Sequence, residues 1–159
     1  MSQVICLEGD GSIMMNLQEL QTVITNKLPI KIFLVNNQGY HSIRQTQRNL
    51  FSNHTRVGIG PESGDLSFPD FSRIATAFGY KYLCAHDNSE MERAVDEALN
   101  FDGALFCEIF TDTVQNWEPK SSARKLEDGT LVSSPLEDLA PFLPREELKR
   151  NMFIPLIDE

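Results

Sequence analysis

The sequence lacks several features that would assign it to a common class of protein. Its three cysteines form no closely spaced pair, which argues against a disulfide framework or a cysteine-based metal site. Apolar runs stay well short of the roughly 20 residues that a membrane span needs, and the N-terminus lacks the basic start and apolar middle of a signal peptide. Basic residues are few, 14 against 23 acidic ones, and the formal net charge of -9 disfavours binding to nucleic acid or to an anionic membrane. These absences predict a cytoplasmic protein with no nucleic-acid partner and no membrane partner.

The chain does contain enough apolar sequence for one domain. It has 159 residues, of which 41% are hydrophobic, and this size suits one core better than two. Cys6, Cys84 and Cys107 lie in apolar segments and are expected to be reduced core residues. We predict an α/β domain over residues 1–112, followed by a proline- and charge-rich tail or lid over residues 113–159.

The spacing of apolar residues predicts alternating strands and helices. Short β-branched and apolar runs indicate strands, and apolar residues at steps of three and four indicate helices. Ser12 is the expected N-cap of the first helix, and Gly79 is expected to end the helix that precedes it. The expected strands are 4–7, 30–35, 80–85 and 104–111, and the expected helices are 13–26, 40–50, 71–78 and 89–99. This order predicts a doubly wound, mainly parallel α/β sheet with helices on both faces, plus an extended C-terminal tail.

Two unusual loops follow the first two expected strands, at residues 9–12 and 36–39. The carboxyl ends of neighbouring parallel strands meet at one edge of a sheet, where open α/β sheets bind ligands. Glycines in the first loop let backbone amides approach a phosphate, but the carboxylate of Asp10 would repel it unless a cation lay between them. Asn37 adds an amide oxygen, and the carbonyl of Gly39 could add another. Three protein oxygens, two diphosphate oxygens and a water make the octahedral set that Mg²⁺ prefers.

Other interpretations of these loops remain open at this point. A Walker loop is excluded because the first lysine is Lys27, far from the glycines. A dinucleotide-binding fingerprint would need a glycine where Met14 stands, which makes a nucleotide-binding domain of another kind a weaker alternative. Either loop taken alone is more often a simple turn. A non-catalytic α/β interaction module that keeps the fold is therefore the main alternative.

The combination of the two loops closely resembles a known cofactor motif. A Gly-Asp-Gly and an Asn-Asn, separated by a helix and a strand, resemble the thiamine-diphosphate motif in the C-terminal cofactor-binding domain of acetolactate synthase-like enzymes. Residues 71–112 also resemble this family, so the similarity covers roughly the first two thirds of the chain. The matching segments are Gly9-Asp10-Gly11, Asn16-Leu17-Gln18-Glu19-Leu20, Leu28-Pro29-Ile30-Lys31-Ile32 and Asn36-Asn37.

The resemblance implies a site for thiamine diphosphate and Mg²⁺. Its implied metal ligands are the side chains of Asp10 and Asn37 and the carbonyl of Gly39. It also implies decarboxylation of a 2-oxo acid and transfer of an acyl carbanion equivalent to an acceptor. The family's loop after Asn-Asn carries a Leu-Gly-Met type sequence, whereas here Tyr40 and His41 follow Gly39, which makes these two residues candidate substrate contacts. The residues implied to bind the cofactor are Gly9, Gly11, Ser12, Asn36, Gly39 and Tyr40.

The resemblance also indicates parts that a complete enzyme would need. In the family a glutamate from a separate N-terminal domain activates the cofactor, and the cofactor lies between two subunits. We find no counterpart of that domain in 159 residues, and the segment before the first strand is expected to be incomplete. The chain is therefore expected to be a portion of an enzyme, with no catalytic residue of its own and inactive alone. It is expected to form a homo-oligomer or a complex with a chain that carries the N-terminal domain.

Overall fold

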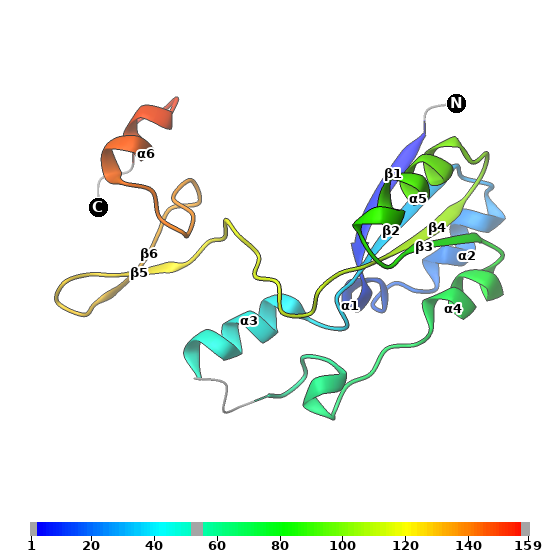
Figure 1. The fold of residues 1–159 in the computed structure, drawn as a ribbon, viewed down its shortest axis with the longest axis horizontal. Coiled ribbons are helices and arrows are strands. Elements are labelled where there is room, and N and C mark those ends of the chain that lie inside the picture. Colours follow the sequence, from blue (N-terminus) through cyan, green and yellow to red (C-terminus); the bar gives the residue numbers. More distant parts are fainter. Residues whose placement is uncertain (1–2, 52–55, 157–159) are drawn as a thin grey trace. The chain divides into compact units, whose positions relative to one another are not determined.

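The computed structural model describes residues 3–51 and 56–156 of the chain (Figure 1). The chain forms two compact units, Met1–Gln115 and Asn116–Glu159. The first unit contains an open sheet and both candidate loops. The second unit contains a short hairpin and a helix.

The sheet of the first unit has four parallel strands in the order β1-β2-β4-β3. In this sheet Gly9 lies opposite Val35, and Asn36 lies opposite Phe110. The carboxyl ends of the first three strands in this order therefore meet at one edge, as the sequence predicted. The strands are β1 Val4–Gly9, β2 Ile30–Asn36, β3 Lys81–Ala85 and β4 Leu105–Phe110.

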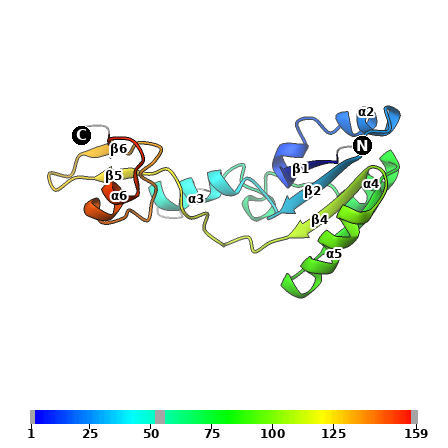
Figure 2. The same cartoon turned by 90° about the horizontal axis from the view of Figure 1, so that it is seen from above.

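Helices cover both faces of the sheet, which confirms the predicted doubly wound α/β fold. Figure 2 shows α2 (Glu19–Thr25) and α5 (Asn88–Asn100) on opposite sides of the strands. One apolar core lies under α2 and α4 (Phe71–Phe78) and includes Leu34 and Phe106. A second core, under α5, is formed by Phe33, Ala85, Ala94, Ala98, Leu105 and Cys107.

The first predicted helix differs from the structure in its start and its continuity. The helix α1 (Asp10–Ile13) begins three residues early with Gly9 as its N-cap, so the prediction of Ser12 as N-cap is wrong. Within this helix the carboxylate of Asp10 accepts a hydrogen bond from the amide of Gly11, and no side chain caps the helix start. The α-helical pattern then breaks, because residues 15 and 16 bond to carbonyls only three positions back. Regular helix resumes at Glu19 in α2.

The helix α4 agrees with the prediction at both ends. Asp70 caps its start by accepting hydrogen bonds from the amides of Ser72 and Arg73. Gly79 ends it with a φ of 89°, a left-handed conformation that glycine adopts without steric cost. The helix α3 (His41–Leu50) also lies where the sequence predicted a helix.

The second unit contains regular elements that the sequence analysis did not predict. An antiparallel pair joins β5 (Ala123–Lys125) to β6 (Leu131–Ser133), and α6 (Arg145–Asn151) follows. The carboxylate of Asp138 is buried and accepts two hydrogen bonds from the guanidinium of Arg145, at 2.6 and 2.9 Å. This bidentate ion pair, partly exposed on the arginine side, joins the start of α6 to the segment before it.

One side of the edge strand β1 is uncovered. Cys6 packs against the core under α2, so the alternate residues Ile5 and Leu7 face the other side of the sheet. Their side chains are 53% and 74% exposed. All three cysteines are free, as predicted, but only Cys107 is buried in the core, whereas Cys6 and Cys84 are partly exposed. Within residues 3–51 and 56–156, no helix is long and apolar enough to cross a membrane.

Candidate functional site

Asp10 joins the two candidate loops. Its side chain is only 1% exposed, yet both carboxylate oxygens are hydrogen-bonded. One oxygen accepts from the amide of Gly11 at 2.8 Å, and the other accepts from the amide of Gly39 at 2.9 Å. Burial raises the pKa of Asp10, whereas these amides and the nearby charge of Arg44 oppose that rise. The site therefore holds a carboxylate in a poorly solvated position, where a cation would stabilise its charge.

Asn37 presents a side-chain oxygen that is not satisfied by the protein. The residue is 7% exposed, and its Oδ1 atom has no hydrogen-bond partner among the described residues. A buried acceptor without a partner is costly, and such atoms usually mark an ion, a water or a ligand. Asn37 lies one residue beyond β2, while Asp10 lies one residue beyond the neighbouring strand β1. The two residues thus place an amide oxygen and a carboxylate at the same edge of the sheet.

Tyr40 and Gly11 make a close contact across the two loops. The Tyr40 hydroxyl donates to the carbonyl of Gly11 at 3.3 Å, and its ring covers the glycine. A Cβ atom at Gly11 would lie 2.5 Å from the Cε1 atom of Tyr40, so only glycine fits beneath the ring. The ring also packs edge-on against Phe68, with 5.9 Å between ring centroids. Tyr40 therefore fixes the loop of the glycines to the start of α3.

Gly39 requires glycine for a second reason. Its φ is 149°, and a Cβ atom there would collide with the carbonyl oxygen of Ile59. The preceding residue, Gln38, also has a positive φ of 55°, and its amide donates to Asn36 Oδ1 at 3.0 Å. The backbone after β2 is thus held in a tight turn that directs the Gly39 amide to Asp10.

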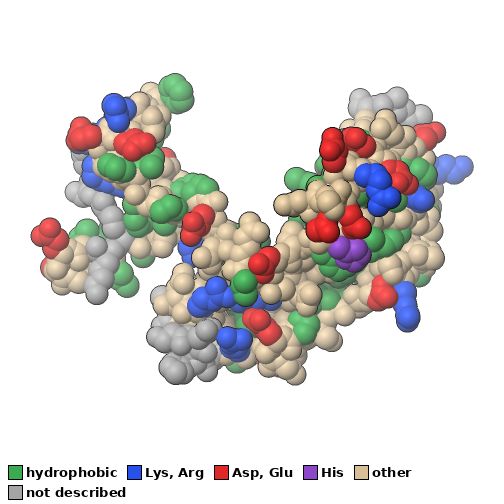
Figure 3. Space-filling view, in the orientation of Figure 1, with side chains coloured by type: hydrophobic (Ala, Val, Ile, Leu, Met, Phe, Trp, Pro, Cys, Tyr) green, Lys and Arg blue, Asp and Glu red, His purple; other side chains and the backbone are tan. Residues whose placement is uncertain are grey.

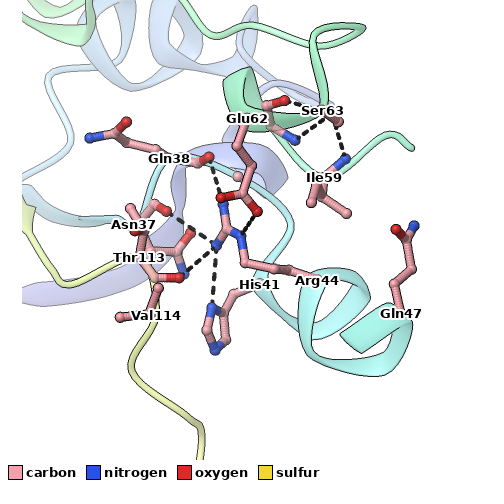
Figure 4. Close-up of polar contacts among 12 residues, drawn as sticks. Asn37, Gln38, His41, Arg44, Gln47, Ile59, Glu62, Ser63, Thr113 and Val114 are labelled. Carbon is pink, nitrogen blue, oxygen red and sulfur yellow. Dashed lines mark hydrogen bonds and ion pairs between the residues drawn. The ribbon is translucent and has the colours of Figure 1, made fainter. Parts of the chain in front are cut away.

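Arg44 organises this turn from the side of α3, as Figure 4 shows. Its buried guanidinium donates to the carbonyls of Gln38 at 3.0 Å and Asn37 at 3.4 Å. It also donates to the carbonyl of Thr113, beyond β4, at 3.3 Å and forms a 2.9 Å ion pair with Glu62. One side chain thereby connects the ends of two strands with the loop before α4.

His41 lies under this arginine and away from solvent. The ring is buried, and its Nδ1 atom is 3.3 Å from Nη1 of Arg44 (Figure 4). Burial lowers the pKa of His41, and the charges of Arg44 and Arg48 act in the same direction. A substrate could reach the ring only if the packing around it changed.

A buried carboxylate on β4 holds the other candidate asparagine. Glu108 accepts a hydrogen bond from Nδ2 of Asn36 at 2.6 Å and another from the Tyr82 hydroxyl at 2.5 Å. Burial and the bond to Glu108 raise the pKa of that hydroxyl. Because its Oδ1 atom accepts from Gln38, Asn36 has both side-chain polar atoms engaged within the protein. These bonds make Asn36 a support of the turn after β2.

The remaining candidates lie in and before α1. Ser12 is exposed in this short helix, and Gly9 precedes it in extended conformation, with a φ of -97°. The described residues contain no group of three or more His, Cys, Asp or Glu side chains that could hold a metal. A cation at this edge of the sheet would therefore use the Asp10 carboxylate, amide and backbone oxygens, and oxygens of a ligand. Such an all-oxygen set suits a hard divalent ion such as Mg²⁺.

Sequence reasoning missed the residues that hold the candidate site in place. Glu108 had a signal, because it is the one charged residue within the apolar run 104–110. Arg44 had no such signal in the sequence, because its ion-pair partner Glu62 and its acceptor Thr113 are 18 and 69 positions away.

Comparisons with known proteins agree with this fold and edge-of-sheet site. Residues 1–109 match the family described as "Thiamine pyrophosphate enzyme, C-terminal TPP binding domain". Since that match spans more than half of the sequence, the chain belongs to this family, which confirms the resemblance found in the motif. Thiamine pyrophosphate is another name for thiamine diphosphate.

Individual relatives are similar over about three quarters of the chain. The acetolactate synthase isozyme 2 large subunit of Escherichia coli (strain K12) is 37% identical over 116 residues, which cover 73% of this chain and 20% of that protein. The acetolactate synthase large subunit of Porphyra purpurea is 33% identical over 119 residues, 73% of this chain and 19% of that protein. The chain thus spans about a fifth of the length of the curated relatives it matches.

A solved structure shares the fold. The thiamine diphosphate-dependent 4-hydroxybenzoylformate decarboxylase of Rhodococcus jostii RHA1 superimposes with a TM-score of 0.59 and 27% sequence identity. The superposition covers 69% of this chain and 20% of that one. This likeness supports the α/β assignment of the first unit.

Proposed function

We propose that the edge of the sheet formed by β1 and β2 binds Mg²⁺ and the diphosphate of thiamine diphosphate. The observation that carries this proposal is the buried Oδ1 atom of Asn37, an acceptor without a partner among the described residues, at the same edge of the sheet as the buried carboxylate of Asp10. These two oxygens and the carbonyl of Gly39 are the proposed protein ligands of the metal. Two diphosphate oxygens and a water would complete the six oxygens that Mg²⁺ prefers.

The proposed diphosphate contacts lie at the end of β1 and the start of α1. Gly9 is the last residue of β1, and Gly11 and Ser12 lie in α1 directly after it. Ser12 is exposed, so its hydroxyl and amide are the proposed diphosphate contacts. Tyr40 packs on Gly11 and keeps this segment against the second loop. We assign Asn36 to positioning this loop, because both of its side-chain polar atoms bond within the protein.

The proposed activity is decarboxylation of a 2-oxo acid followed by acyl transfer, as in acetolactate synthase-like enzymes. Thiamine diphosphate, when bound, supplies the carbon nucleophile and the electron sink for breaking the bond beside a 2-oxo carbonyl. The residues of this chain bind and orient that cofactor through its diphosphate end. Substrate contact by Tyr40 and His41 stays a prediction, and for His41 it would require the ring to become uncovered.

A further chain or domain is proposed to complete the enzyme. The chain spans about a fifth of the length of its curated relatives. We assign none of the described carboxylates of this chain to activating the cofactor. The uncovered side chains of Ile5 and Leu7 on the edge strand β1 support an association on that side of the sheet. We therefore propose that the chain works in a homo-oligomer or with a chain carrying an N-terminal domain, and that alone it is inactive.

Paramagnetic broadening tests the proposed metal position. Mn²⁺ can replace Mg²⁺ in oxygen sites and broadens the NMR signals of nearby amides. With thiamine diphosphate present, we expect the amides of Gly11, Gln38 and Gly39 to broaden first. Asn37→Ala should weaken this broadening, whereas Asn100→Ala, an exposed asparagine on α5, should leave it unchanged.

The acidic residues on α5 are a second place where a cation could collect, and binding there would contradict the proposal. Glu92, Asp96 and Glu97 line an open depression on that helix and could attract a cation without any built site. Broadening centred on α5, with the strand-end amides unaffected, would contradict the proposal.

A further inference from the structure

A small cavity beside α3 is lined by three arginines and a single acidic residue. It has a volume of about 70 Å³, and its lining is Arg44, Gln47, Arg48, Arg56, Ile59, Glu62 and Val114. Lys and Arg side chains also gather over α3 on the face of the molecule drawn in Figure 3. This local excess of positive charge stands out in a chain whose formal net charge is -9.

The positive charge of the cavity is only partly compensated. Glu62 pairs with Arg44 at 2.9 Å, and the other donors of Arg44 go to backbone carbonyls and to His41. Arg48 and Arg56 form no ion pair with any described carboxylate. Arg48 follows Arg44 by one helical turn, a spacing at which like charges repel. Two guanidinium groups therefore face one cavity without a counter-charge from the described residues.

The protein holds these two arginines next to each other. Gln47, the neighbour of Arg48, donates from Nε2 to the carbonyl of Val57 at 2.7 Å and accepts from the amide of Val57 at 3.2 Å. Val57 is the neighbour of Arg56, so this pair of hydrogen bonds fixes the backbone at Arg56 against α3. Buried Ile59 closes another wall of the cavity. The arginines are thus brought together by specific contacts made by their neighbours.

We infer that this cavity binds the oxyanion group of a small ligand, a carboxylate or a phosphate, through the guanidinium groups of Arg48 and Arg56. A guanidinium presents parallel N–H donors that match the paired oxygens of these groups. A cavity of about 70 Å³ admits one such group with few waters and excludes a larger charged body. Glu62 stays paired with Arg44 and limits the cavity on that side. The inference does not rest on the proposed cofactor site.

An NMR titration of the chain tests this inference. Inorganic phosphate and pyruvate, as a small monocarboxylate, are added separately at constant ionic strength set with chloride. We expect saturable shifts of the amides of Gln47, Arg48 and Val57. Arg48→Gln and Arg56→Gln should each weaken the apparent affinity by about tenfold, the effect of losing one charge-assisted hydrogen-bonding group. Arg73→Gln, which removes an 87% exposed arginine on α4, should leave the affinity unchanged.

The two ligands distinguish the possible sources of the oxyanion. Saturation by phosphate alone assigns a phosphate group, and saturation by pyruvate alone assigns a carboxylate. Shifts that do not saturate, or equal affinities in the wild type and in Arg56→Gln, would overturn the inference. Arg56 is exposed, so Arg56→Gln decides the question even if Arg48→Gln does not fold.

Discussion

The carboxylate of Asp10, one residue beyond β1, accepts a 2.9 Å hydrogen bond from the amide of Gly39, three residues beyond β2. This bond joins two strand ends that are 29 positions apart in the sequence. The second oxygen of Asp10 accepts from Gly11, so the carboxylate is fixed in place although almost no solvent reaches it. A metal or diphosphate would meet a site whose two loops are already joined.

The contact between Gly11 and Tyr40 predicts a clear difference between two neighbouring glycines. Gly11→Ala places a Cβ 2.5 Å from the Tyr40 ring, and overpacking of this kind lowers the free energy of unfolding by about 1–3 kcal/mol. Gly9→Ala is the matched control, because its nearest atom would be Ser12 Oγ at an ordinary 3.7 Å. Urea denaturation of both variants measures the difference. Equal losses at the two positions would show that the Tyr40 ring does not restrict Gly11.

Arg44 is expected to stabilise the chain much more than an exposed arginine. Arg44→Met leaves the carbonyls of Asn37, Gln38 and Thr113 and the carboxylate of Glu62 without their donor, so we expect a loss of about 1–3 kcal/mol. Arg73→Met is the control and should change stability by no more than about 0.5 kcal/mol. Chemical denaturation measures both. A loss at Arg44 as small as the control would mean that the turn after β2 holds without it.

The hydrogen bond between Tyr82 and Glu108 predicts coupled effects on stability. Tyr82→Phe removes a partly buried donor from the buried carboxylate of Glu108, and we expect a loss of about 1–3 kcal/mol in the free energy of unfolding. Glu108→Gln changes the other partner, and because the residues are in contact the two losses should not add. A double-mutant cycle by urea denaturation measures the coupling. Additive losses would contradict a direct interaction.

We expect His41 to contribute to the pH dependence of the free energy of unfolding. Its folded-state pKa lies below the ordinary value of 6.5, so the unfolded chain takes up the proton first as the pH falls. This contribution to stability is present above pH 6.5 and is lost as the pH falls from 6.5 towards the lowered folded-state pKa. Between about pH 7.5 and about pH 5, His41→Gln should therefore lose less stability than the wild type. Urea denaturation at the two pH values measures the losses, and equal losses in His41→Gln and the wild type would contradict this contribution.

The fold of the first unit was largely predictable because its strands and helices bury regular apolar patterns. The run Ile30–Asn36 reads as a buried strand, and Gly79 marks the end of α4. The start of α1 was not predictable from apolar spacing, because the helix begins at Asp10, a charged residue outside the apolar pattern. The hairpin and α6 were missed because short elements held by an ion pair such as Asp138–Arg145 leave little apolar pattern.

The candidate site was predictable only in part. The Gly-Asp-Gly and Asn-Asn segments identify the two loops, since neighbouring parallel strands end at the same edge. Arg44 and Tyr82, which help to shape those loops, could not be predicted, because they act through contacts between distant positions. Glu108 stood out as a charged residue in an apolar run, but its bond to Asn36, 72 positions away, did not. Their roles depend on contacts that only the folded chain makes, and a short sequence motif does not indicate such contacts.

Isothermal titration of the chain with thiamine diphosphate, with and without Mg²⁺, tests the central claim most directly. We expect binding that requires Mg²⁺ and is lost in Asp10→Ala, because the carboxylate supplies the charged metal ligand. Asp102→Ala, an exposed aspartate at the opposite end of the sheet, should bind as the wild type does. Equal binding by the wild type and Asp10→Ala, or binding indifferent to Mg²⁺, would contradict the proposed site.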